Sequence, residues 1–206
     1  MKITLSNAGK RFNREWIFRL ADLQFESSIA YAITGPNGSG KSTLLQSIGG
    51  MLQLSEGSIK YENAKGELRS EEIYQTVSFC APYLDVIEEM NLVEFLEFHQ
   101  QFKSFLPGLD AQKVISILGL EAASQKLIRN YSSGMKQRVK LAQAILSDTS
   151  VVLLDEPCSN LDAAGIALYH SLIEKYCKDR LVIVSSNDEV EYKFCEKRIS
   201  ITDFKS

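Results

Sequence analysis

Hydrophobic and polar residues alternate with two different periods along this chain of 206 residues. Apolar residues recur at helical spacing from Lys41 to Gly50, after a glycine-rich loop, and from Ala163 to Cys177, after an acidic pair. Strands and helices that alternate in this way predict a parallel α/β layer, whereas the earliest strands are expected to be antiparallel. Short apolar runs bounded by turn residues predict the strands themselves, at "MKITL", "WIFRLADLQF", "IAYAIT", "GSIKYE", "TVSFCA", "VVLLD", "LVIVSS" and "RISITDF".

A helical segment interrupts the strands between about residues 87 and 149. The stretches "EEMNLVEFLEFHQQF" and "LDAQKVISILGL" carry apolar residues at helical spacing and are separated by Pro107 and Gly108. A last helix is predicted from about Ser133 to Leu146, with "YSSG" as its capping stretch. We therefore expect one domain over residues 1–206, with a core lobe of about 1–86 and 150–206 and an inserted helical lobe of about 87–149.

Composition and charge narrow the classes of partner. The 23 basic and 26 acidic residues give a net charge of -3, so there is no bulk electrostatic attraction to nucleic acid. The N-terminus lacks the apolar stretch of a secretion signal, and no window has the roughly 18 apolar residues of a membrane span. We expect a cytoplasmic protein. The four cysteines form no CxxC pair, which disfavours a zinc site or disulfides, and they are expected to be reduced, small core residues: Cys80, Cys158, Cys177 and Cys195.

The stretch "GPNGSGKST" joins an expected strand to an expected helix, which is the context that a phosphate-binding loop (Walker A) requires. Glycines let the backbone wrap closely around phosphate oxygens, and the helix N-terminus adds positive potential. Lys41 would reach the β and γ phosphates of a nucleotide, and the Ser42 hydroxyl would hold Mg²⁺. A plain glycine-rich turn is the alternative, but this pattern arises by chance in only about one in a hundred chains of this length. The predicted nucleotide-binding residues are Gly35, Pro36, Asn37, Gly38, Ser39, Gly40, Lys41, Ser42 and Thr43.

The strand "VVLLD" is apolar throughout and then ends on two adjacent acids, Asp155 and Glu156. Such a strand is typical of a sheet buried on both faces, and its carboxyl end is where ligands bind in open α/β sheets. Alone, this pattern is commonplace and more often structural. Beside a phosphate loop, it predicts the second acidic element of a P-loop enzyme (Walker B), in which Asp155 serves Mg²⁺ and Glu156 orients and deprotonates an attacking water.

Further stretches make the sequence resemble the nucleotide-binding subunit of ATP-binding-cassette (ABC) transporters. The segment "YSSGMKQRVKLAQAIL" is similar to the family's LSGGQ signature and its helix, and "SNLD" at residues 159–162 is similar to the family's D-loop. The resemblance implies an ABC ATPase fold that binds ATP and Mg²⁺ and hydrolyses ATP. It also implies that two cassettes face head to tail, so that Ser132 and Gly134 of one contact the γ phosphate bound by the other. An ordinary helix cap would explain Ser132 but not the following Gly134.

The resemblance further implies partners and an adenine site. The partners would be a second cassette, in a homodimer or heterodimer, and a membrane permease subunit, which places the chain at the inner face of the membrane. The stretch from Pro82 to Glu89 and the helical lobe would receive the permease. Phe12 stands where the family stacks an aromatic ring on adenine, and Trp16 and Phe18 are rival candidates.

The chain departs from the family pattern in ways that bear on hydrolysis. Pro82 stands where the family usually has a glutamine near Mg²⁺, and Asn187 stands where it usually has a histidine that contacts the γ phosphate. Asn187 can donate a hydrogen bond to phosphate but cannot be cationic. We therefore hypothesise tight ATP binding with slow hydrolysis; the opposite hypothesis is that Glu156, Lys41 and Mg²⁺ suffice.

Ser133 and Met135 replace the usual glycine and glutamine of the signature. The only histidines, His99 and His170, lie in other segments and cannot substitute for the missing one.

Two other functions stay open. The first is a soluble cassette acting on nucleic acid or ribosomes, which the acidic balance disfavours. The second is a P-loop kinase, which would leave the signature and the D-loop unexplained.

Overall fold

The computed structural model describes residues 1–205 and divides into two compact units. The first unit comprises Met1–Phe79, Thr149–Glu156 and the segment from Asp179 onward, and the second comprises Cys80–Asp148 and Pro157–Lys178. The phosphate loop and the acidic pair therefore belong to the first unit. The signature and the D-loop belong to the second.

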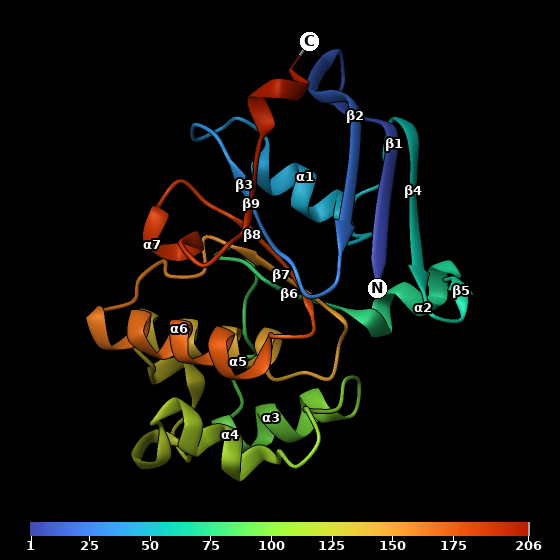
Figure 1. The fold of residues 1–206 in the computed structure, drawn as a ribbon. Helices are drawn as coiled ribbons and strands as arrows, with labels where there is room; N and C mark the ends of the chain where they lie inside the picture. Colours follow the sequence, from blue (N-terminus) through green and yellow to red (C-terminus); the bar gives the residue numbers. More distant parts are fainter. Residues whose placement is uncertain (206) are drawn as a thin grey trace. The chain divides into compact units, whose positions relative to one another are not determined.

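One of the two sheets is antiparallel, as expected, with the strand order β2-β1-β4-β5 (Figure 1). Strand β1 is much longer than predicted because it continues through a bulge between Leu5 and Ala8, where Asn7 takes a φ of 46°. Polar residues in that bulge hide the strand period from the sequence. The strands are β1 (Lys2–Phe12), β2 (Glu15–Glu26), β4 (Glu56–Asn63) and β5 (Gly66–Glu67).

The other sheet has the order β6-β7-β8-β3-β9, and its pairs β7 with β8, β8 with β3, and β3 with β9 are parallel. Every residue of β7 and β8 is buried, which confirms the prediction of strands covered on both faces. The strands are β3 (Ala30–Thr34), β6 (Val77–Cys80), β7 (Val151–Asp155), β8 (Leu181–Ser185) and β9 (Lys197–Ser200).

Helix α1 (Lys41–Ile48) contacts strands of both sheets and lies beside β3 in Figure 1. Its apolar face, Leu44, Leu45 and Ile48, belongs to one buried cluster with side chains from both sheets. Burying each such side chain stabilises the fold by about 1.5–3 kcal/mol. This packing fixes the start of α1, and with it the phosphate loop, against the carboxyl end of the parallel sheet.

The prediction of a last strand "RISITDF" is wrong over its second half. Strand β9 ends at Ser200, and Ile201–Phe204 forms a 3-10 helix, η3. The Ile201 side chain is fully buried so close to Gly35 that a Cβ on Gly35 would lie 2.6 Å from Ile201 Cγ2. Tertiary packing against the phosphate loop therefore overrides the alternating pattern.

Two short helices were not expected. Helix α2 (Ser70–Thr76) begins with a capping interaction in which the Arg69 backbone N–H donates to Glu72, and helix α7 (Glu189–Tyr192) is capped by Asp188. Of the two, only α7 follows a residue type that favours a helix start, and both helices are too short to show a helical hydrophobic period.

The second unit is built mainly from helices, and α3 and α4 are separated by a segment that contains Pro107 and Gly108. Polar side chains cap the four main helices by accepting backbone N–H bonds at their starts: Asn91, Asp110, Ser132 and Asp162. The elements are α3 (Leu92–Gln100), α4 (Ala111–Leu118), η1 (Glu121–Ala123), η2 (Ile128–Asn130), α5 (Ser133–Ile145) and α6 (Ala163–Tyr176). No helix within residues 1–205 is long and apolar enough to cross a membrane.

The cysteines are free thiols, and Cys80, Cys177 and Cys195 are buried as expected. Cys158 is only half-buried, so its assignment to the core is wrong. The physical reason is its position in the turn after the acidic pair rather than in a strand or helix.

A buried polar network fixes the end of α3 in the second unit. His99 Nε2 lies 2.8 Å from Ser147 Oγ, which itself donates to the Gln143 carbonyl, and Gln143 Nε2 lies 3.1 Å from His99 Nδ1. These contacts suit a neutral imidazole with its proton on Nε2. Burial, helped by the charge of Lys103, lowers the pKa of His99 from 6.5 to about 4.

We predict that this histidine makes stability pH-dependent. In the unfolded chain His99 takes up a proton below about pH 6.5, whereas in the folded chain it stays neutral to about pH 4. The unfolded state therefore binds more protons, and the free energy of unfolding falls by up to about 3 kcal/mol as the pH drops through this window. Urea unfolding of the native chain and of His99→Gln across the window measures the effect. The two curves should diverge as the pH falls, and parallel curves would contradict the assignment.

Candidate nucleotide-binding site

The phosphate loop, Gly35–Thr43, follows β3 and runs into the first turn of α1, and its residues 37–43 line a cavity of about 260 Å³. Gly40 has a φ of 100°, and a Cβ there would lie 2.3 Å from Ile17 Cγ2, so only glycine fits. Ile17 of β2 and Glu156 line the same cavity. Ile17 was missed from the sequence because nothing in the spacing of β2 distinguishes it from a core residue.

Lys41 opens α1 and is almost fully buried. Its ammonium Nζ donates to the carbonyl oxygens of Gly35, at 2.9 Å, and Pro36, at 3.2 Å. Ser42 and Thr43 follow in the first helical turn and line the cavity. The loop thus holds one fixed positive charge together with hydroxyl groups at a helix N-terminus, where anions are favoured.

The acidic pair divides into a buried and an exposed carboxylate. Asp155, the last residue of β7, is 2% exposed, and Glu156 is exposed and lines the cavity of the phosphate loop. Glu156 has a φ of 44°, a left-handed conformation that costs of order 1–3 kcal/mol for a residue with a side chain. Its N–H donates to the Ser185 carbonyl at 2.9 Å, which holds this backbone turn in place.

Buried oxygen atoms without hydrogen-bond partners show what this corner can bind. In the first unit they are Asp155 Oδ1, Ser39 Oγ and Ser185 Oγ, with Thr4 Oγ1 in β1 as the fourth. An unpaired buried polar atom costs about 1–3 kcal/mol, which a bound polar group can recover. Hydroxyl and carboxylate oxygens are the ligands that Mg²⁺ prefers. The residues present therefore fit a phosphate group with Mg²⁺, and Ser42 and Asp155 would hold the ion.

Asn187 lies at the phosphate loop, although 150 residues separate it from Asn37 in sequence. Its side-chain Nδ2 donates a hydrogen bond to Asn37 Oδ1. The two histidines lie in the second unit, His99 in α3 and His170 in α6. Pro82, at the position of the family's glutamine, also belongs to that unit, and its carbonyl accepts from Lys140 Nζ at 3.0 Å.

The three candidate aromatic residues have different environments. Phe12 ends β1 and is 49% exposed, so its ring is accessible to a base. Phe18 is fully buried in the core, so its ring is not accessible to a base and the prediction of Phe18 as a rival candidate is wrong. The guanidinium groups of Arg11 and Arg19 lie over the Trp16 ring, 5.5 and 4.5 Å from its centroid, and Lys10 Nζ lies 5.1 Å from the centroid of the Phe12 ring, so both rings make cation–π contacts.

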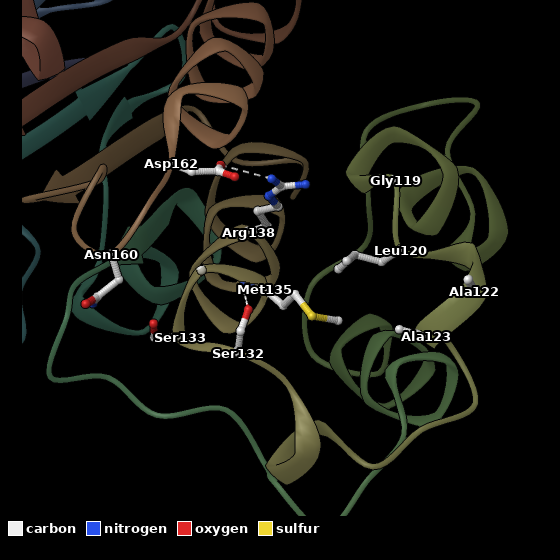
Figure 2. A pocket seen from close by; sticks show the side chains of 11 residues that line it. Gly119, Leu120, Ala122, Ala123, Ser132, Ser133, Met135, Arg138, Asn160 and Asp162 are labelled. Atoms are coloured by element: carbon white, nitrogen blue, oxygen red, sulfur yellow. Dashed lines mark hydrogen bonds and ion pairs between the residues drawn. The ribbon is translucent and has the colours of Figure 1, made fainter.

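The signature lines a separate pocket of about 540 Å³ in the second unit (Figure 2). Ser132 caps α5, and its Oγ accepts a hydrogen bond from the Met135 backbone N–H at 3.2 Å. A Cβ on Gly134 would lie 3.0 Å from the carbonyl oxygen of Asn160 in the D-loop. Packing therefore favours glycine at position 134, because a residue without a Cβ lets the D-loop approach the start of α5. The sequence did not reveal this.

One wall of this signature pocket is polar and the opposite wall is apolar. Arg138 of α5 forms an ion pair of 3.2 Å with Asp162, which also caps α6 by accepting the Gly165 N–H. The backbone hydrogen bond from Gly165 and then the Arg138 side chain lower the pKa of Asp162. In Figure 2 the Met135 side chain extends toward the opposite wall, which includes Leu120. Sequence reasoning missed both Arg138 and this apolar wall.

Solved structures and curated sequences resemble the chain over nearly its whole length. It is 29% identical over 202 residues to the uncharacterized ABC transporter ATP-binding protein YybJ of Bacillus subtilis, covering 94% of this chain and 89% of YybJ. The dimeric structure of MJ0796, a bacterial ABC transporter cassette, superimposes with a TM-score of 0.81 at 22% identity over 97% of this chain and 94% of that one. A post-hydrolysis dimer of MJ0796 bound to ADP and Pi has a TM-score of 0.80 at 22% identity, covering 96% and 93% of the two chains.

These likenesses confirm the predicted fold class, a P-loop ABC ATPase fold with a parallel α/β core, an antiparallel β subdomain and a helical part. The family model described as ABC transporter matches residues 18–159, which include the phosphate loop, the signature and the acidic pair. This match also confirms the expected enzyme class, an ABC-type ATPase. The chain belongs to the ABC transporter family.

Proposed function

We propose that this chain is the ATP-binding and hydrolysing subunit of an ABC transporter, working as a dimer against a separate membrane permease. The observation that carries the proposal is the cavity of the first unit, which Lys41 and Glu156 line together with the glycines of the phosphate loop. A buried carboxylate, Asp155, ends the adjoining strand with an unpartnered oxygen. A cation, an exposed acid and a buried acid around a phosphate-sized cradle suit a nucleoside triphosphate with Mg²⁺.

Each group then has one chemical task. The loop N–H groups and Lys41 bind the β and γ phosphates, and Ser42 and Asp155 hold Mg²⁺, which would neutralise charge on the phosphates. Glu156 accepts a proton from the attacking water, since its exposed carboxylate lines the cavity. Phe12 offers its exposed ring to adenine.

The positions of the remaining motif residues support a dimer. Ser132 and Gly134 line the signature pocket and not the cavity of the phosphate loop. We propose that they bind the γ phosphate held by a second cassette, identical or related, because the N-terminus of α5 favours anions. The MJ0796 cassette, which has the same fold, is dimeric.

A permease would dock on exposed residues that follow β6. Tyr83 and Leu84 are 50% and 38% exposed, and Asp85 and Glu89 are exposed acids, whereas Val86 packs inside. Docking there would place the chain on the cytoplasmic, inner face of the membrane. The net charge of -3 disfavours the alternative of nucleic acid or ribosomes as partners.

We predict that the affinity-tagged chain, extracted in mild detergent, copurifies with one membrane protein in stoichiometric amount. Replacing Tyr83 and Leu84 by serine should weaken this association by removing apolar contact area, while replacing Met51, an equally exposed apolar residue of the first unit, by serine is the control. Mass spectrometry of the eluate measures the outcome. Ribosomal proteins or nucleic acid in place of a membrane protein would contradict the transporter assignment.

We propose that this subunit hydrolyses ATP slowly because Asn187 stands at the position of the family's histidine. Its amide is engaged with Asn37 of the phosphate loop and carries no charge, so it stabilises the developing charge on the γ phosphate less than an imidazolium would.

We predict that Asn187→His raises the steady-state rate of phosphate release by up to about 10²-fold, because one restored donor to the transition state is worth that much. Combining it with Glu156→Gln should abolish turnover, which shows that the gain arises at this site. An unchanged rate in Asn187→His, with ATP binding intact, would instead favour the view that Glu156, Lys41 and Mg²⁺ already suffice.

A further inference from the structure

Strand β8 ends on a polar residue where its pattern calls for an apolar one. Its first four residues, Leu181–Val184, are apolar and buried, and the fifth is Ser185. Ser185 is 0% exposed, and its hydroxyl has no hydrogen-bond partner. A buried unpaired hydroxyl costs free energy that a valine at this position would avoid, so the serine requires a reason beyond packing.

The register of the parallel sheet places Ser185 directly beside Asp155. The two residues are partners in the ladder between β7 and β8, and neighbouring strands lie about 4.8 Å apart. Leu153 and Ile183, two positions earlier on each strand, are also partners and belong to the same core cluster. Because side chains alternate along a strand, Asp155 and Ser185 project from that same face of the sheet.

The neighbouring strand on the other side leads to the phosphate loop. Ser185 is also the ladder partner of Ile33 in β3, and the loop begins two residues later at Gly35. Ser185 therefore stands between the acidic strand and the strand that carries the phosphate loop. Its hydroxyl belongs to neither motif, and nothing in the phosphate-loop or signature patterns assigns it a role.

Asp155 and Ser185 each place an unpartnered oxygen on adjacent strands, and a hydrogen-bond donor bound between the strands could satisfy both oxygens. Asp155 Oδ1 can only accept a hydrogen bond when ionised, and a serine oxygen can accept one as well. Mg²⁺ usually keeps several of its waters in protein sites, and each water has two hydrogens to donate. We propose that Ser185 is a positioning residue for Mg²⁺: its hydroxyl and Asp155 Oδ1 would accept the hydrogens of a Mg²⁺-bound water, so that Asp155 holds the ion through this water. This inference rests on the proposed function of the same site.

Calorimetry with and without Mg²⁺ separates an effect of Ser185 on Mg²⁺ binding from an effect on ATP binding. ATP is titrated into the native chain and into Ser185→Ala, once with Mg²⁺ and once with a chelator and no divalent ion. The variant should bind ATP with Mg²⁺ about tenfold more weakly, as is typical when an outer partner of a metal site is removed. Its affinity for ATP without Mg²⁺ should equal that of the native chain, because Ser185 does not touch the phosphates in this arrangement.

Two further variants keep the test decisive. Thr4→Val removes an unpartnered buried hydroxyl of the first unit that lies in β1, outside the phosphate loop, and it should leave both affinities unchanged. Ser185→Cys keeps the side-chain volume but replaces the oxygen by a weak acceptor, so it should reproduce the selective loss even if the alanine variant folds poorly.

The outcomes distinguish this inference from the function on which it rests. If Ser185→Ala and Ser185→Cys keep the native Mg²⁺ dependence and only gain stability in urea unfolding, Ser185 is an unsatisfied core hydroxyl and the inference is overturned alone. If the native chain binds ATP no better with Mg²⁺ than without it, or not at all, the proposed function fails as well.

Discussion

Carboxylates and a phosphate cradle can share one corner of a sheet only if positive charge lies between them. Asp155 ends a fully buried strand, Glu156 lines the cavity of the phosphate loop, and a nucleoside triphosphate would add further negative charge. Lys41, buried at the start of α1, supplies one fixed positive charge. A divalent ion supplies the rest in our account, and every other role proposed for this site depends on that balance.

In our proposal the same charge constraint divides the binding residues between two surfaces of the chain. The first unit carries the cradle, the cation and the acids, whereas the second carries a capped helix start and a pocket with one polar and one apolar wall. The N-terminus of α5 favours an anion, but the D-loop carbonyl of Asn160 already lies close to Gly134. In our proposal each surface is completed by a second cassette, so that ATP itself becomes the contact between two copies.

The local features of the site were predictable because each has a strong sequence signal. Glycines with lysine and serine after a strand, and acids after an apolar run, are patterns that backbone geometry and charge require. Packing effects left no such signal. Ile17 approaches Gly40 from another sheet, Ile201 turns the end of β9 into a 3-10 helix, and Phe18 is a core residue although it lies near Phe12 in sequence. These depend on tertiary contacts that no spacing along one chain encodes.

Calorimetric titration of ATP with Mg²⁺ into the native chain and into Lys41→Ala tests the charge balance most directly. Lys60→Ala, which removes an exposed lysine paired with Glu67 at 3.7 Å in the antiparallel sheet, is the matched control. The account predicts one site per chain, an affinity at least about tenfold lower in Lys41→Ala, and no change in Lys60→Ala. Absence of binding heat with folded native protein, or equal affinities in Lys41→Ala and the native chain, would contradict it.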